Sequence, residues 1–290
     1  MRLFLLVSLT MVAFAANSVL NRLALAGSHI EAVPFGTIRL IAGAAMLAGL
    51  CLVLRGGLRL RGPGRAVGVI ALVAYLYGFS LAYDALDAGL GALILFGMVQ
   101  LTMFTSSVLA REALPVRRWV GALLALAGLC WLMWPGQAVQ VSALHAGLMA
   151  LAGIAWGVYS LAGRGAGDAL SKTAANFVLA VPLGVLALLV LPGAGHMAPP
   201  TAAGWALAIL SGAVTSGLGY ALWYSVLPRL PASVAAVAQL TVPIIALAGG
   251  VLLLGEVITP RIAFASALVL GGVALSVLPQ RKLWGGLRKS

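Results

Sequence analysis

The chain contains ten apolar stretches, each of roughly the length needed to cross a lipid bilayer. An α-helix rises ~1.5 Å per residue and the hydrocarbon core of a bilayer is ~30 Å thick, so about 20 apolar residues span it. Proline, glycine and polar residues separate the stretches, and the loops are short. The sequence therefore predicts an all-α membrane protein with ten transmembrane helices near residues 3–25, 33–54, 66–86, 89–110, 117–134, 143–163, 172–191, 204–227, 231–254 and 260–278.

The few charged residues fall mainly on one side of the predicted membrane. They make up 8% of the chain, against about 25% in an ordinary soluble domain, which excludes a water-soluble globule. If the N-terminus is cytoplasmic, 15 of the 18 lysines and arginines lie on the cytoplasmic side, Arg22 and Arg261 lie outside, and Arg39 lies within a span. This bias is the positive-inside pattern. It predicts a multi-pass protein of the bacterial inner membrane with both termini in the cytoplasm.

The position of the positive charges also indicates their partner. The net charge of +12 would suit nucleic acid in a soluble protein, but here most charges lie at the membrane surface. Residues 281–290 form a basic tail, which we expect to lie in the cytoplasm against anionic lipid headgroups. The predicted partners are therefore membrane lipids and a small-molecule substrate, and no nucleic acid.

The two halves of the chain resemble each other. Offsets of 144, 142 and 141 residues align polar and aromatic residues in the same order: Glu112 with Glu256, Arg22 with Arg164, and Tyr83 with Tyr224. Each half then holds five helices, and because five is odd, the second half enters the membrane from the opposite side. We expect two inverted five-helix repeats, 1–138 and 139–280, with a site between them at the midplane. The alternative is an old duplication that serves folding alone.

Two stretches resemble the ten-helix, EamA-type transporters of the drug/metabolite transporter superfamily. One runs from Tyr220-Ala-Leu-Trp-Tyr through Pro231-Ala-Ser to Gly255-Glu256, and the other is its weaker copy through Arg111-Glu112. The first helix of each half is also similar to that family, with the stretches Ala13-Phe14…Ser18 and Ala155-Trp156-Gly157…Ser160. The resemblance covers essentially the whole chain and implies the same transporter fold.

Within that family, the aromatic residues of the third, sixth and eighth helices resemble those of the YddG-type aromatic amino-acid exporters. The resemblance also places the helices that carry Asn17 and Gln239 around the substrate cavity. The first half departs from the family pattern, because Arg111 replaces a glycine before the glutamate and Val99 stands where the second half has Pro243. These departures concern the symmetry of the two halves and leave the implied fold unchanged.

Aromatic residues share faces of the predicted helices. Helical spacing places Tyr75, Phe79 and Tyr83 on one face of the third helix, and a similar group lies on the eighth. Aromatic rings stack on a flat, partly apolar solute, while amides and hydroxyls bind its polar end. The competing interpretation assigns these rings to the aromatic belts at the membrane surface. The predicted substrate-binding residues are Asn17, Tyr75, Phe79, Tyr83, Trp156, Ser160, Tyr220, Trp223, Tyr224 and Gln239.

Arg39 is a charge predicted to lie within the membrane. An ionisable residue at this depth is a functional candidate. Three roles are open to it: binding a substrate carboxylate, pairing with Glu31, Asp84 or Asp87, or snorkelling to the membrane surface. We therefore treat it as a candidate for a charge or gating role.

Helix breaks and helix ends supply the remaining candidates. Pro243 interrupts the ninth predicted helix, which either frees a backbone carbonyl near the cavity or is a plain packing kink. Glu112 and Glu256 end the fourth and ninth helices, each five residues before an arginine. We expect these glutamates to form structural pairs with those arginines, and we include Pro243 as a gating candidate.

The absence of certain residues limits the mechanism. No Asp, Glu or His occupies the middle third of a predicted span, where a proton relay needs one, and the chain has no phosphate-binding loop for ATP. The patterns of an intramembrane enzyme are also absent, so we predict no catalytic residue, metal or cofactor. We predict an exporter of small amphipathic metabolites, with aromatic and other neutral amino acids preferred. Drugs, nucleosides and sugars are alternative substrates, and a membrane scaffold or assembly protein is the alternative of another class.

Overall fold

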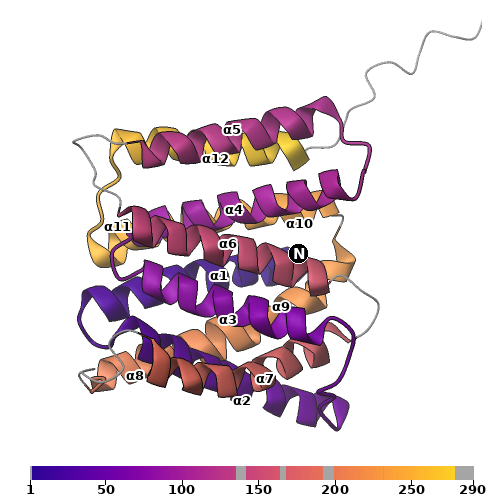
Figure 1. The fold of residues 1–290 in the computed structure, drawn as a ribbon, viewed down its shortest axis with the longest axis vertical. Coiled ribbons are helices and arrows are strands. Elements are labelled where there is room, and N and C mark those ends of the chain that lie inside the picture. The colour runs from indigo at the N-terminus through magenta and orange to yellow at the C-terminus, as the bar shows by residue number, and fades with distance from the viewer. Residues whose placement is uncertain (1, 135–141, 164–167, 192–198, 231, 278–290) are drawn as a thin grey trace, which may run out of the picture.

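The protein consists of helices that lie side by side in layers (Figure 1). The computed structural model describes residues 2–134, 142–163, 168–191, 199–230 and 232–277, and these residues form helices and no strands. The expected repeat boundary at 138 and the basic tail 281–290 lie outside the described residues. The elements are α1 (Arg2–Ala26), α2 (Ala32–Arg55), α3 (Arg65–Ala82), α4 (Ala88–Leu109), α5 (Val116–Met133), α6 (Ala143–Gly163), α7 (Ala169–Val190), α8 (Ala202–Ile209), the π-helix η1 (Leu210–Leu218), α9 (Gly219–Val226), the 3-10 helix η2 (Leu227–Arg229), α10 (Ala232–Gln239), α11 (Thr241–Leu254) and α12 (Pro260–Val277).

The helices confirm a multi-pass membrane protein. Eight are long and apolar enough to cross a membrane, and they coincide with the first eight predicted spans. The eighth of these runs continuously over 202–229 and contains α8, η1, α9 and η2. Two shorter apolar helices, Thr241–Leu254 and Pro260–Ser276, fall within the ninth and tenth predicted spans.

The ninth predicted span is broken between α10 and α11. Leu240 separates the two helices, three residues before the buried Pro243. Proline has no N–H to donate to the carbonyl four residues earlier, and its ring crowds that carbonyl, so the preceding turn loses its regular hydrogen bond. The Thr241 hydroxyl instead donates to the Ala238 carbonyl at 2.6 Å. The break expected from Pro243 is therefore present, whereas Pro182 lies within a continuous α7.

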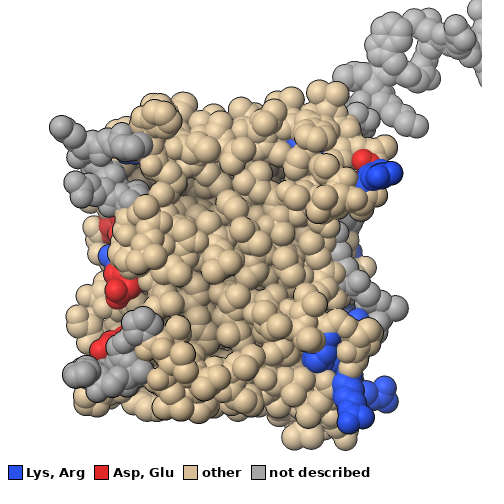
Figure 2. Space-filling model, in the orientation of Figure 1, with Lys and Arg blue, Asp and Glu red and all other residues tan. Residues whose placement is uncertain are grey.

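The outer surface matches a lipid environment. Large apolar side chains are widely exposed, among them Val53 and Leu252 with exposed fractions of 82% and 81%. Figure 2 shows a broad, almost entirely uncharged face between two edges that carry charged residues. Lys and Arg gather mainly at the right edge and Asp and Glu mainly at the left. An apolar band bounded by two polar edges is what a spanning protein presents to a bilayer.

Small residues allow the main helix pairs to pack closely. α5 lies along α12, where a Cβ on Gly121 would overlap the carbonyl oxygen of Gly272, and the reverse also holds. α3 packs along α6, with Gly78 against the Leu148 carbonyl. α2 packs against α7 and η1, and α4 packs against α6 and α11. Such close backbone approach through small residues is typical of helix packing in membranes.

Candidate functional site

Arg39 of α2 is fully buried, although it carries a positive charge. Its Nε donates to Ser216 Oγ at 3.0 Å and its Nη2 donates to the Tyr75 hydroxyl at 3.2 Å. The guanidinium carbon lies 4.9 Å from the ring centre of Phe79 and 5.5 Å from that of Tyr75, within cation–π range. Its Nη1 has no hydrogen-bond partner, and no ion pair between described residues includes it. Arg39 therefore does not snorkel to the surface.

The π-helix η1 brings hydroxyl groups to Arg39. A Cβ on Gly212 would overlap the Arg39 carbonyl oxygen, so glycine is needed for η1 to approach α2 this closely. The wider turns of a π-helix occur often at functional sites. Asn17 of α1 accepts hydrogen bonds at Oδ1 from three hydroxyls of η1, namely Ser211 Oγ at 2.8 Å, Thr215 Oγ1 at 2.5 Å and Ser216 Oγ at 3.4 Å. The buried polar groups of α1, α2 and η1 thus form one network.

Most of the predicted aromatic residues meet in one buried layer. The Trp156 ring lies 4.8 Å from Tyr75 and 5.0 Å from Tyr220, measured between ring centres. Phe79 continues the layer from Tyr75 to Tyr83, with ring centres at 5.5 and 4.7 Å. Trp223 is also buried and joins through Phe14. We call this group the aromatic layer; its members are Phe14, Tyr75, Phe79, Tyr83, Trp156, Tyr159, Phe177, Tyr220 and Trp223.

The aromatic layer contains three residues that were not in the predicted set. Phe14 and Tyr159 lie three residues from the predicted Asn17 and Trp156, so helical spacing places each of them beside a predicted residue. Phe177 comes from α7 and contacts the Tyr220 ring at 5.8 Å. α7 carries no second aromatic residue, so helical spacing provides no signal for it.

The space between the rings is small in this conformation. A void of about 20 Å³ is lined by members of the aromatic layer together with Asn17, Ser18, Leu95 and Phe96. A void of this size holds about one water molecule. The aromatic side chains therefore fill the expected pocket themselves, and they must separate to admit an aromatic solute.

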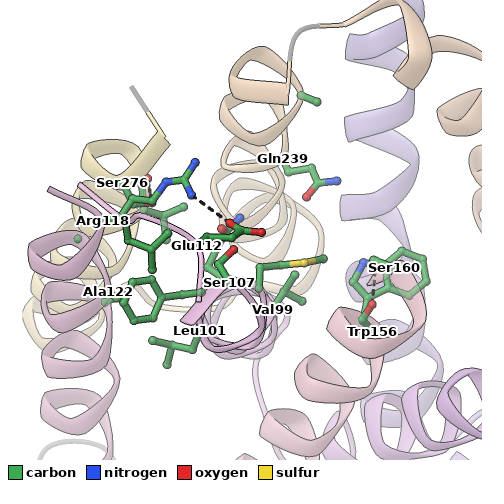
Figure 3. Close-up of a pocket in the computed structure, with 18 of the residues that line it drawn as sticks. Val99, Leu101, Ser107, Glu112, Arg118, Ala122, Trp156, Ser160, Gln239 and Ser276 are labelled. Atoms are coloured by element: carbon green, nitrogen blue, oxygen red, sulfur yellow. Dashed lines mark hydrogen bonds and ion pairs between the residues drawn. The ribbon is translucent and has the colours of Figure 1, made fainter. Parts of the chain in front are cut away.

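A larger cavity begins beside this layer and opens near one end of α4 (Figure 3). Its volume is about 520 Å³, and its walls come from α4, α5, α6, α9, α10 and α12. Trp156 lines both this cavity and the small void, so it stands between them. The predicted residues Ser160, Tyr224 and Gln239 line the cavity and are not part of the aromatic layer. At its edge Glu112 pairs with Arg118 at 3.9 Å.

The opposite end of α4 is closed by a largely buried carboxylate. Glu256 Oε1 accepts a hydrogen bond from the Ala88 backbone N–H at 2.7 Å, and it lies 4.0 Å from Arg22 Nε. Arg22 also pairs with Asp87 at 3.7 Å and donates to the backbone carbonyl of Tyr83. These contacts join α1, α4 and the residues that follow α11. Burial raises the pKa of the Glu256 carboxyl, and the Ala88 hydrogen bond offsets this in part.

The expected pairing of each glutamate with the arginine five residues later is wrong. Glu256 lies against Arg22, while Arg261 donates to the carbonyls of Trp131 and Trp134. Glu112 pairs with Arg118, one residue beyond the expected partner. Packing of α1 on α11 brings Arg22 to Glu256, a neighbour that sequence distance does not reveal.

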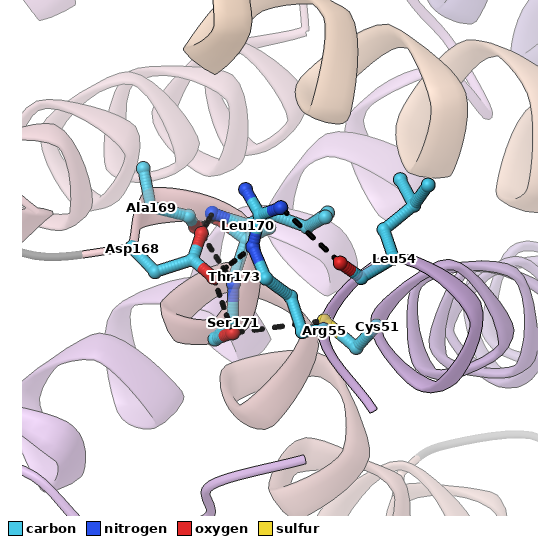
Figure 4. Close-up of polar contacts among 8 residues, drawn as sticks. All are labelled: Cys51, Leu54, Arg55, Asp168, Ala169, Leu170, Ser171 and Thr173. Atoms are coloured by element: carbon cyan, nitrogen blue, oxygen red, sulfur yellow. Dashed lines mark hydrogen bonds and ion pairs between the residues drawn. The ribbon is translucent and has the colours of Figure 1, made fainter. Parts of the chain in front are cut away.

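A second polar cluster joins α2 to α7 (Figure 4). Asp168 caps the first turn of α7 by accepting hydrogen bonds from the N–H groups of Leu170 and Ser171, and it pairs with Arg55 at 2.6 Å. Partial burial alone raises the pKa of the Asp168 carboxyl, but hydrogen bonds from Arg55 and Ser171 outweigh burial and hold the pKa below its ordinary value. Because every group of the cluster has a partner within it, we assign it a structural role.

Comparison with known proteins assigns the family. Residues 144–278 match the EamA-like transporter family. This chain carries an EamA domain of the drug/metabolite transporter superfamily. It also belongs to one family with the uncharacterized protein PA1977 of Pseudomonas aeruginosa, to which it is 47% identical over 280 residues, covering 96% of each chain. The EamA match indicates a membrane transporter and favours transport over an enzymatic activity.

A solved structure shares the fold along nearly the whole chain. It is described only as a crystal structure of a protein, and it covers 95% of this chain and 99% of its own, with a TM-score of 0.65. The sequences are 21% identical, so the likeness concerns the fold alone. The EamA domain is therefore part of an architecture that extends through both halves.

The α2–α7 cluster predicts a pH-dependent contribution to stability. Asp168→Ala removes the helix cap, worth about 1 kcal/mol, as well as the ion pair, whereas Asp168→Asn keeps an acceptor for the cap. Because the pKa of Asp168 is lowered in the folded state, the stabilisation is present at neutral pH and is lost as the pH falls through that pKa. We expect thermal midpoints in detergent to fall in the order wild type, Asp168→Asn, Asp168→Ala at pH 7. Equal midpoints for wild type and Asp168→Asn at every pH would contradict this role of the ion pair.

The cavity predicts which positions a polar reagent reaches. In a background with Cys51→Ala and Cys130→Ala, a cysteine at Ser107 or Ser160 lies in the cavity wall, while one at Ser80 is fully buried. We expect a hydrophilic maleimide to label the first two positions at least tenfold faster than the third. Equal rates at all three positions would show that the cavity is not open as described.

Proposed function

We propose that this EamA protein exports small amphipathic metabolites, preferably aromatic and other neutral amino acids, across the bacterial inner membrane. The observation that carries the proposal is the aromatic layer at the end of a cavity that opens to one side. Rings bind flat solutes through apolar contact and stacking, and the adjacent hydroxyls and amides can hold a polar end. The family match supports transport, and the substrate class is inferred from these side chains.

The packing pattern supports two inverted halves that alternate. Helices at corresponding positions in the two halves pack together: α2 with α7, α4 with α11, and α5 with α12. The contact of α3 with α6 likewise corresponds to that of the 202–229 helix with α1. We propose that one half rocks against the other about this interface, so that the aromatic layer faces each side in turn.

The two helix-end glutamates mark the open and the closed side. Glu112 and Glu256 are equivalent at an offset of 144 residues, yet their side chains are 53% and 11% exposed. Glu256 binds the N–H of Ala88, the first residue of α4. The equivalent partner for Glu112 is the N–H of Ala232, the first residue of α10. We propose that Glu112 takes up this contact when the cavity closes and Glu256 releases its own.

The charge distribution supports an orientation with both termini in the cytoplasm. Lys and Arg gather mainly at one edge of the molecule (Figure 2), as the positive-inside bias of a bacterial membrane protein requires. In that orientation the cavity opens to the cytoplasm, where an exporter collects its substrate. No acidic residue or histidine lies in the middle of a span, and the chain has no ATP-binding loop. We therefore propose facilitated export or exchange without a carboxylate relay.

Substitution of Trp156 tests the proposed substrate class. We expect purified protein in liposomes to exchange labelled phenylalanine or tryptophan, and Trp156→Ala to slow this exchange about tenfold, because losing a ring contact of about 1.4 kcal/mol changes an equilibrium tenfold. Trp205→Ala is the matched control, since Trp205 is 48% exposed on the outer surface.

The exchange rates distinguish aromatic amino acids from the alternative substrates. Exchange of aromatic amino acids at the rate of empty vesicles would contradict the assignment, and faster exchange of nucleosides, sugars or cationic drugs would favour those alternatives. An absolute requirement for a pH gradient would contradict the proposed absence of a relay.

Substitution of Glu256 tests the proposed alternation between the two open states of the transporter. Glu256→Ala removes the acceptor for the Ala88 N–H, whereas Glu256→Gln retains it, so only the alanine variant is expected to open the closed end. A cysteine at the buried Ser18 reports this opening by faster maleimide labelling from the periplasmic side. Because burial raises the pKa of Glu256, the closed arrangement binds a proton more tightly and is favoured as the pH falls. Unchanged labelling in Glu256→Ala would contradict the proposed contact.

A further inference from the structure

Arg39 is a buried positive charge that has no acidic partner among the described residues. Its fully buried guanidinium uses two nitrogens in hydrogen bonds to neutral hydroxyls, and Nη1 has no partner. The rings of Tyr75 and Phe79 compensate the charge in part through cation–π contact. A buried charge without an ion pair is costly, and the usual solution is a paired, hydrogen-bonded anion. The described residues supply no such anion to Arg39.

Four acidic residues that could in principle neutralise Arg39 pair with other arginines instead. Glu256 and Asp87 lie against Arg22, Glu112 pairs with Arg118, and Asp168 pairs with Arg55. None of the six acidic residues of the chain lies in the middle of a span. The centre of the molecule therefore carries one positive charge and no negative charge among the described side chains.

The guanidinium borders the space that a substrate would enter. Tyr75 and Phe79 contact the guanidinium and also line the small void, and Trp156 lines both the void and the cavity. The Tyr75 hydroxyl accepts hydrogen bonds from Arg39 and, at 3.4 Å, from Tyr220. Its own O–H proton thus remains to be donated. When the rings separate, Arg39 Nη1 and the Tyr75 hydroxyl offer two neighbouring donors to one anionic group.

The same site offers no carboxylate to an ammonium group. Asn17 Oδ1 already accepts three hydroxyl hydrogen bonds. A substrate ammonium would meet ring faces and hydroxyls close to a like charge. Charge complementarity therefore favours a solute with a negative end and an aromatic or apolar body.

We propose that Arg39 binds the carboxylate of the substrate, and that the site recognises aromatic carboxylates without requiring an ammonium group. The carboxylate accepts hydrogen bonds from Arg39 Nη1 and the Tyr75 hydroxyl, and the ring lies among the side chains of the aromatic layer. This inference rests on the proposed function, because it names the part of an aromatic solute that the same site recognises.

Four related ligands distinguish the contributions of the carboxylate and the ammonium group to binding. L-phenylalanine carries both charged groups, 3-phenylpropionate only the carboxylate, phenethylamine only the ammonium, and 3-phenylpropanamide neither. Calorimetric titration of the full-length protein in detergent at pH 7 is expected to give similar affinities for the first two and at least tenfold weaker binding of the last two. Equal binding of phenethylamine and 3-phenylpropionate, or no binding of 3-phenylpropionate, would overturn the proposal.

Variants at Arg39 distinguish binding from a structural role. Arg39→Gln is expected to weaken binding of both carboxylates at least tenfold, while its thermal midpoint without ligand equals or exceeds that of the wild type, because an uncompensated charge has been removed. Arg39→Lys retains the charge but lacks the planar fork of guanidinium donors, and it is expected to bind at an intermediate level. Arg55→Gln is the control: Arg55 lies at the end of the same helix and pairs with Asp168 away from the layer, so binding should persist even if stability falls.

The outcomes also separate this inference from the proposed function. Wild-type affinity of Arg39→Gln for 3-phenylpropionate overturns the role of Arg39, whereas liposome exchange of aromatic amino acids in that variant leaves the proposed function intact. A lowered midpoint with unchanged affinity shows a structural arginine and also overturns the inference. Failure of the wild type to exchange any aromatic amino acid rejects the proposed function, whatever the titrations show.

Discussion

A buried guanidinium without a carboxylate partner constrains the rest of this structure. Burying a charge costs several kcal/mol even after the surroundings relax, so a helix carrying Arg39 is stable only where other helices present hydrogen-bond acceptors and ring faces to it. α2 finds these on α3 and η1, through Tyr75, Phe79 and Ser216. Gly212 allows the required approach, since any side chain there would meet the backbone of Arg39. The polar network and the aromatic layer are therefore parts of one arrangement around this charge.

The two ends of the molecule differ although their sequences correspond. At one end Glu256 is buried against Arg22 and the start of α4, and at the other Glu112 is exposed at the edge of the cavity. A molecule with equivalent ends in different states is what alternating access requires. The filled aromatic layer lies between them, and in the proposed alternation its rings separate as the two halves move.

Much of the fold could be predicted from the sequence because the bilayer thickness sets helix length. The spans and the break before Pro243 follow from hydropathy and from the missing proline N–H. Helical spacing places Tyr75 on an aromatic face of its own helix, whereas its contact with Trp156 and Tyr220 of other helices comes from tertiary packing. The π-helix could not be predicted from the sequence, because it depends on the tertiary contact of Gly212 with the Arg39 backbone.

The partner of Glu256 was wrongly expected for the same reason: Arg22 is distant in sequence and adjacent in space. Side-chain packing also placed the larger cavity beside the rings rather than among them.

If the buried centre holds the substrate, the substrate carboxylate lies against the Arg39 guanidinium. Solid-state NMR distance measurement between the ¹³C-labelled carboxylate of bound 3-phenylpropionate and ¹⁵N-labelled arginine side chains tests this directly. Charge-assisted N–H···O bonds are about 2.8 Å between nitrogen and oxygen, so we expect a carbon–nitrogen distance of about 4 Å that disappears in Arg39→Gln. A bound ligand whose carboxylate shows no such contact, or whose contact persists in that variant, would show that Arg39 does not hold the carboxylate.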